Sequence, residues 1–152
     1  MYSLRPYGHD DAEAVLAIWW DSWHSIQPGL HHPEPLSSWR ARWLADIVPT
    51  QTIVVVADER RVLVGFAAAN VRSSELTQIF VAPARKRLGI GRLLLEWAQG
   101  QMPSGFTLQT LTRNAASRNF YCQQGLLEGG TQTNPFNGME TIEYRWAPLR
   151  MS

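Results

Sequence analysis

The chain has 152 residues, of which 45% are hydrophobic and 18% are charged, and its formal net charge is +1. This length suits one domain over residues 1–152, and the composition excludes an intrinsically disordered chain. The nearly balanced charge gives no general reason to expect a nucleic acid or an acidic membrane as partner.

The sequence carries one cysteine, Cys122, which excludes an internal disulfide and suits a reducing compartment. Its first residues lack the basic and apolar regions of a signal peptide. No stretch approaches the roughly 18 apolar residues of a membrane span. We therefore expect a cytoplasmic protein without membrane contact.

The first third of the chain predicts one strand and two helices. A short strand is expected over residues 2–6, and a helix that starts at Asp10 or Asp11 and ends at Pro28-Gly29. A second helix is expected over residues 37–47. Five of the seven tryptophans fall in this region, namely Trp19, Trp20, Trp23, Trp39 and Trp43. We expect them mainly in the core, and the alternative is an aromatic wall near a ligand.

The remaining elements are strands interrupted by two helices. Strands are predicted over residues 52–57, 62–71, 75–82 and 106–111, helices from 89 and over 114–124, and a final hairpin from 126–133 and 139–146. This order predicts a mixed α/β fold, in which helices cover both faces of a mixed sheet.

Residues 75–95, ELTQIFVAPARKRLGIGRLLL, predict a strand, a glycine-bearing turn and a helix. Three basic residues precede Gly89 and Gly91 in the turn. A helix start directs unpaired backbone N–H groups and the positive end of the helix dipole at one point. The stretch therefore predicts a site for an anion such as a phosphate.

Two common nucleotide motifs do not fit this turn. A P-loop requires Lys and then Ser or Thr after its last glycine, but Arg92 and Leu93 follow Gly91. A dinucleotide fingerprint requires a third small residue, where this chain has Leu94, and an acidic residue at a later strand end. Residues 109–112 offer no such acid.

A strand ending in V-x-P, then a basic residue three positions before G-I-G, resembles the acetyl-CoA-binding motif [Q/R]-x-x-G-x-[G/A] of the GNAT N-acetyltransferase superfamily. Lys86 stands where that family has Gln or Arg, a mild departure because Arg85 and Arg87 can share the solvation of a phosphate. Downstream, residues 114–126, NAASRNFYCQQGL, resemble the family's N-x-x-[A/S]-x-x-[F/L]-Y-x-x-x-G-[F/L] segment. With two motifs in the correct order, the chain is identified as a member of this superfamily.

The resemblance implies a mostly antiparallel mixed sheet of about seven strands that splays between the fourth and the fifth. It also implies acetyl-CoA as cofactor and no metal. In the family, the strand before the turn pairs its backbone with the pantetheine arm, and the turn takes the pyrophosphate. The expected cofactor-binding residues are Ile79, Phe80, Val81, Arg85, Lys86, Arg87, Gly89, Ile90, Gly91, Arg92, Asn114, Ser117 and Tyr121. A helix N-cap is a further role for Asn114 and does not exclude cofactor contact.

Tyr121 and Glu75 are the expected catalytic residues. A phenol placed near the sulfur can donate its proton to the leaving thiolate, and an ordinary phenol with a pKa of about 10 is protonated at neutral pH. The alternative for Tyr121 is an aromatic core residue. Glu75 is the hypothesis for the general base, directly or through water, and its alternative is a solvated charge at a strand end. Cys122 has no base signature around it, so a covalent acetyl-cysteine route is disfavoured.

The resemblance implies transfer of the acetyl group of acetyl-CoA to a primary amine of a small molecule, by direct attack in a ternary complex. Two alternatives stay open: an acyl-CoA-binding regulatory domain without turnover, and acetylation of a protein or peptide amine. A nucleic-acid contact by residues 85–87 is disfavoured, because few other basic residues support it. The oligomeric state is open, and a homodimer is compatible with the family.

The acceptor is expected between the first two helices, residues 27–36 and residues 134–138. Their aromatic side chains would favour a cationic or apolar amine. His24, His31 and His32 also fall in this region, where we expect ordinary surface histidines.

Overall fold

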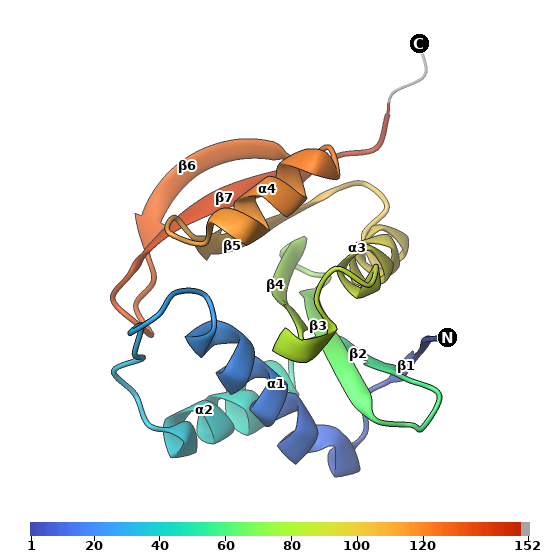
Figure 1. Cartoon of the computed structure of the whole chain (residues 1–152). Helices are drawn as coiled ribbons and strands as arrows, with labels where there is room; N and C mark the ends of the chain where they lie inside the picture. The colour runs from blue at the N-terminus through green and yellow to red at the C-terminus, as the bar shows by residue number, and fades with distance from the viewer. Residues whose placement is uncertain (150–152) are drawn as a thin grey trace.

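The computed structural model describes residues 1–149, which form a seven-stranded sheet with helices on both faces (Figure 1). The strand order is β1-β2-β3-β4-β5-β7-β6. The strands are β1 (Ser3–Pro6), β2 (Thr52–Ala57), β3 (Leu63–Asn70), β4 (Glu75–Val81), β5 (Phe106–Leu111), β6 (Leu127–Thr133) and β7 (Glu140–Trp146). The helices are α1 (Ala12–His24), α2 (Leu36–Arg42), α3 (Ile90–Gln101) and α4 (Ala115–Gln123), with short 3-10 turns η1 (His9–Asp11) and η3 (Pro83–Arg85) and a π-helical turn η2 (Trp43–Ile47).

The sheet splays between β4 and β5, which confirms the expected topology. β1 to β4 pair in antiparallel order, and β5, β7 and β6 form a second antiparallel group. β4 and β5 run parallel and share the register pair Glu75–Thr107 at the start of β4. Beyond this pair the two strands diverge, so the rest of β4 is paired with β3 on one side alone.

The two faces of the sheet carry separate hydrophobic cores. α1 and α2 pack on one face with Ile53, Val55 and Phe66, and α3 and α4 pack on the other with Val54, Val56 and Leu108. Alternation along β2 explains this division, because successive side chains of a strand point to opposite faces. Of the five tryptophans expected mainly in the core, Trp19, Trp23, Trp39 and Trp43 are buried there, and Trp20 is partly buried against the same core.

α3 is held close to the sheet by a small residue in β3. A Cβ added at Gly65 would lie 3.0 Å from Ile90 Cγ2 and 3.0 Å from the carbonyl oxygen of Phe80. This glycine therefore allows a close approach that a side chain would block. It places the first turn of α3 directly beside the end of β4.

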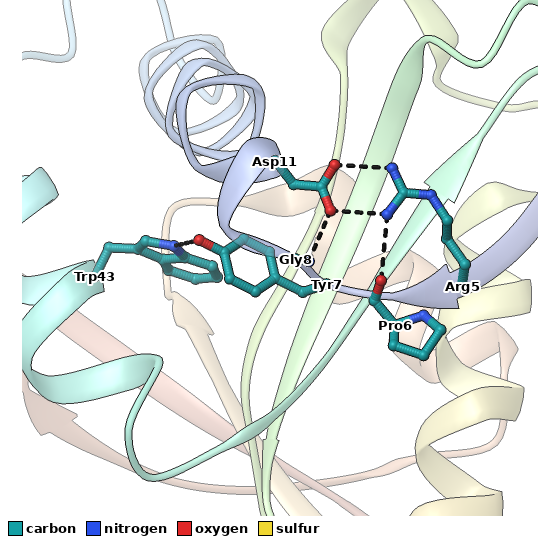
Figure 2. A network of polar contacts seen from close by, with 6 residues as sticks. All are labelled: Arg5, Pro6, Tyr7, Gly8, Asp11 and Trp43. Carbon is teal, nitrogen blue, oxygen red and sulfur yellow. Dashed lines mark hydrogen bonds and ion pairs between the residues drawn. The ribbon is translucent and has the colours of Figure 1, made fainter.

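The start of α1 is fixed by the network in Figure 2. The Asp11 carboxylate accepts two hydrogen bonds from Arg5, both at 2.8 Å, and one from the backbone N–H of Gly8 at 2.8 Å. Next to it, the Trp43 indole N–H donates to the Tyr7 hydroxyl at 3.1 Å. These bonds tie β1, α1 and η2 together, and the Arg5 guanidinium beside Asp11 lowers the pKa of that carboxyl.

Two helices differ from the sequence prediction, one in where it ends and one in the type of its last turn. α1 ends at His24, four residues before Pro28-Gly29, because the His24 Nδ1–H donates to Trp20 O at 2.8 Å and the Ser25 hydroxyl donates to Ser22 O at 2.8 Å. These side chains satisfy carbonyl groups that a further turn would use. The second predicted helix has the expected extent, but its last turn is π-helical, with Val48 N–H donating to Trp43 O at 2.9 Å.

Candidate active site

A cavity of about 710 Å³ opens where β4 and β5 diverge. We call one wall the glycine-turn side; it is formed by β4, residues 85–92 and α4. We call the other wall the aromatic side; it is formed by Trp19, Trp23, Trp39, Phe136, His32 and Arg42. The elements expected to build a cofactor site and an acceptor site therefore meet in one cleft.

The glycine turn has the backbone geometry of an anion site. Arg87 has φ 66° and Gly89 has φ 84°, both in the left-handed region. A Cβ added at Gly89 would meet nothing within 4 Å, so the glycine is required by its φ angle and not by space. Left-handed residues in a turn are typical of backbone bends that present N–H groups to an anion, and α3 begins directly after Gly89, so its unpaired N–H groups lie at the same turn.

The cations of the turn differ in their availability. Arg85 donates to the Asp58 carboxylate at 2.9 Å, which holds its guanidinium against the turn between β2 and β3. Arg92 is paired with Glu96 one helical turn on, at 3.2 Å. Lys86 and Arg87 are exposed, and within residues 1–149 no carboxylate forms an ion pair with either of them. These two are the cations free to meet an anion.

α4 packs closely against the glycine turn and carries Tyr121. Asn114 is the N-cap of α4, and its Oδ1 accepts a hydrogen bond from Ser117 N–H at 3.1 Å. A Cβ added at Gly91 would lie 3.1 Å from Phe120 Cζ, which shows how near α4 lies to the start of α3. The second sequence motif is thereby brought onto the first.

Tyr121 is buried, with 5% of its surface exposed, and it lines the cleft. Its ring lies 5.4 Å from that of Tyr144. Among residues 1–149 nothing forms a hydrogen bond with its hydroxyl, which is not one of the buried polar atoms without a partner, so the oxygen is open to the cleft that the residue lines. Burial, and secondarily Tyr144, raises the pKa of the Tyr121 phenol well above its ordinary value. The phenol therefore stays protonated and keeps its donor free.

The aromatic side of the cleft is packed against the end of β4. The Ser22 hydroxyl on α1 donates to Val81 O at 2.7 Å, which fixes α1 to the last residue of that strand. Trp19 and Trp39 lie with ring centroids 4.7 Å apart, and Trp39 is 5.8 Å from Phe136. Trp19 and Trp39 are therefore buried core residues that also line the cleft, so they form an aromatic wall as well as part of the core.

His32 was expected at the surface, and this expectation is wrong: 5% of the residue is exposed, and it lines the cleft. Its Nδ1 accepts a hydrogen bond from the Glu34 backbone N–H at 2.9 Å, so the neutral ring carries its proton on Nε2. That Nε2 is the buried side-chain polar atom without a hydrogen-bond partner among residues 1–149. Burial, followed by the nearby His24, lowers the pKa of His32 to about 4.

Arg42 is a second cleft residue that the sequence reasoning missed. Its guanidinium lies over the Phe136 ring, 4.4 Å from the centroid, and is half-buried. Burial lowers its pKa, and Asp46 acts in the opposite direction. The sequence feature that could have identified Arg42 as a cleft residue is its spacing from Trp39, because residues three apart share a helix face.

The structure brings together every residue expected to bind the cofactor, from Ile79 on β4 to Tyr121 on α4, as lining of the one cleft. Glu75 is placed differently. It is exposed at the first position of β4 and does not belong to the cleft lining. The described residues that line the cleft include no aspartate or glutamate, so a base at Glu75 would have to act through water.

Residues 1–149 contain no group of three or more His, Cys, Asp or Glu side chains arranged to hold a metal ion. Within the same range, none of the helices combines the length and apolar character needed to cross a bilayer.

Comparison with known proteins gives a consistent result. A family model described as the acetyltransferase (GNAT) family matches residues 12–126. No curated protein matches the sequence. Among solved structures, apo YjaB from Escherichia coli is 22% identical with a TM-score of 0.78, over 95% of this chain and 97% of that one.

Two other solved structures share the fold. A GCN5-related N-acetyltransferase from Rhodopseudomonas palustris is 19% identical with a TM-score of 0.77, over 96% of this chain and 95% of that one. The PaiA N-acetyltransferase from Thermoplasma acidophilum, in complex with coenzyme A, is 17% identical with a TM-score of 0.70, over 96% and 99% of the two chains. These likenesses extend the match beyond the family model to the final hairpin.

Proposed function

The chain belongs to the acetyltransferase (GNAT) family, and from this premise we propose that it transfers the acetyl group of acetyl-CoA to a primary amine of a small molecule. When bound, acetyl-CoA supplies a thioester that the amine attacks directly in a ternary complex, so that an amide forms and the coenzyme leaves as a thiol. One observation carries the proposal. Both motif segments line the same cleft, at the place where the sheet splays.

The residues on the glycine-turn side fit coenzyme A. Lys86 and Arg87 supply cations without partners in the described chain, beside a turn whose backbone is in an anion-binding conformation. β4 presents an edge that β5 does not cover beyond Glu75, which suits the amide groups of a pantetheine arm. The coenzyme A complex of the PaiA acetyltransferase, which has the same fold, supports this assignment.

Tyr121 would act on the leaving thiolate. Its pKa is raised, whereas a thiol such as that of cysteine has a pKa of about 8.5, so complete proton transfer to the thiolate is unfavourable. A phenol with a free O–H can still stabilise the developing charge by a hydrogen bond, which is a strong interaction in a site from which water is excluded. We therefore assign Tyr121 the role of hydrogen-bond donor to the sulfur.

The attacking amine must lose a proton, and no carboxylate among residues 1–149 lines the cleft to take it. Glu75 stays a proposal for this role, acting through a chain of water molecules from the start of β4, where that strand is still paired with β5. His32 is unsuited, because its Nδ1 is engaged by Glu34 N–H and its Nε2 carries the ring proton.

The test is thiol release from acetyl-CoA by the purified full chain, measured with and without each member of a panel of small primary amines. The proposal predicts release that depends on the amine. Tight binding of acetyl-CoA without release for any amine would favour a regulatory domain, and release with peptides alone would favour a protein or peptide acceptor.

A further inference from the structure

We propose that the acceptor amine carries a carboxylate, and that this group binds to the His32 imidazole N–H and the Arg42 guanidinium on the aromatic side of the cleft. The inference rests on the proposed acetyltransferase function and names the class of its acceptor. Two independent observations support it: a buried donor without a partner, and a cation without a counterion.

The first observation is the state of His32. Its Nε2–H is buried and lacks a hydrogen-bond partner among residues 1–149, although buried donors are nearly always paired. The ring cannot rotate freely to solve this, since Nδ1 accepts from Glu34 N–H and the His32 backbone N–H donates to His24 Nε2 at 3.3 Å. The donor is held in place beside the cleft that His32 lines, where an oxygen of a ligand would supply the missing acceptor.

The second observation is the charge of Arg42. Within residues 1–149 no carboxylate forms an ion pair with this half-buried guanidinium, and Asp46 is the acidic group that influences its pKa. A partly desolvated cation is strongly stabilised by an anion that reaches it. Because no carboxylate of residues 1–149 lines the cleft, the ligand must supply that anion.

The two donors lie around the same ring. His32 is 4.6 Å from Phe136 between ring centroids, and the Arg42 guanidinium is 4.4 Å from the Phe136 centroid. The charge of Arg42 also acts on the His32 ring and helps to lower its pKa, so both donors belong to one part of the cleft, where a single carboxylate can neutralise Arg42 and accept from His32. The aromatic side was expected to favour a cationic or apolar amine, and Arg42 already lies over the ring of Phe136 as a cation. The remaining surface of Trp19 and Trp23 suits the apolar body of the acceptor.

The first experiment compares matched acceptors. kcat/KM is measured for amino acids with apolar side chains, with the amine at the α position or farther from the carboxylate, and for the carboxamide of each. A charge-assisted contact of this kind predicts that the better carboxylate acceptors exceed their carboxamides by about 10- to 150-fold. Amines that react equally well with and without the carboxylate would overturn the inference and leave the acetyltransferase function intact.

The second experiment uses variants at the two donors. Arg42→Met and His32→Phe should each abolish most of the preference for carboxylate over carboxamide, while His32→Gln, which keeps an N–H donor, should retain part of it. Arg40→Met is the matched control, because Arg40 lies on the same helix but pairs with Glu13 at 3.0 Å outside the cleft. It should leave the preference unchanged.

Binding gives a readout that does not require turnover. In a thermal-shift assay with coenzyme A present, carboxylate-bearing amines should raise the Tm of the wild type and of Arg40→Met, but not that of Arg42→Met. A loss of coenzyme A affinity in Arg42→Met would assign the cation to the cofactor and overturn the inference. If no amine of any class releases thiol, the proposed function itself fails, which is distinguishable from a lack of carboxylate preference.

Discussion

Replacing Tyr121 by phenylalanine tests the chemistry of the cleft most sharply. The hydroxyl has no hydrogen-bond partner among residues 1–149, and the ring keeps its contact with Tyr144, so the free energy of unfolding should change by less than about 1 kcal/mol. If the phenol donates to the leaving sulfur, kcat should fall by about 100-fold or more. That factor corresponds to about 2.7 kcal/mol of barrier. The affinity for acetyl-CoA should change little.

The matched control is Tyr144→Phe. The Tyr144 hydroxyl accepts from Arg118 Nε at 3.2 Å and donates to Glu128 at 2.9 Å, and this residue lies outside the cleft lining. Its loss should lower the free energy of unfolding by about 1–2 kcal/mol and leave kcat nearly unchanged. Thiol release at saturating acetyl-CoA and urea unfolding measure the two effects. An unchanged kcat in Tyr121→Phe, or a parallel loss of activity and stability in that variant, would refute the assigned role.

Three further predictions concern the turn, the base and the buried histidine. Gly89→Ala should lower the free energy of unfolding by about 1–2 kcal/mol, because alanine is strained at a φ of 84°. A clash adds nothing to this loss, since no atom lies within 4 Å of the new Cβ; equal urea midpoints for variant and wild type would contradict the prediction. Glu75→Gln should lower kcat/KM by about 100-fold if this carboxylate takes the amine proton through water, and a change of less than about threefold would remove Glu75 from the mechanism. Burial lowers the pKa of His32 to about 4, below its ordinary 6.5, so protonation favours the unfolded chain. The unfolding free energy should therefore drop by up to about 3 kcal/mol as the pH falls from 6.5 to 4, and His32→Gln should flatten this profile; an equal slope in both proteins would refute it.

The parts of the fold that could be predicted from the sequence depend on local signals. The run of branched residues in β2 and the apolar spacing of α3 fix the element type within a few residues. The glycine turn was equally readable, because Gly89 adopts a conformation that other residues reach only with strain. The match of a second segment, residues 114–126, then supplied the position of α4.

The rest of the site depends on contacts between distant parts of the chain. His32 lies within a proline-containing loop with no periodic pattern, and it is buried because Trp23 of α1, Trp39 of α2 and Phe136 close around it. Arg85 looked equivalent to its basic neighbours in the sequence, but the fold brings Asp58 to it from another turn. Such pairings decide which charges remain free, and local patterns carry no information about them.

The central claim is that the cleft between β4 and β5 transfers an acetyl group to an amine. It is tested most directly by following an isotopically labelled acetyl group from acetyl-CoA while the free thiol is counted. The account predicts one labelled amide for each thiol released, with both signals reduced together by Tyr121→Phe. Thiol release without a labelled amide, or acetyl-CoA binding without release in the presence of every amine tested, would contradict it.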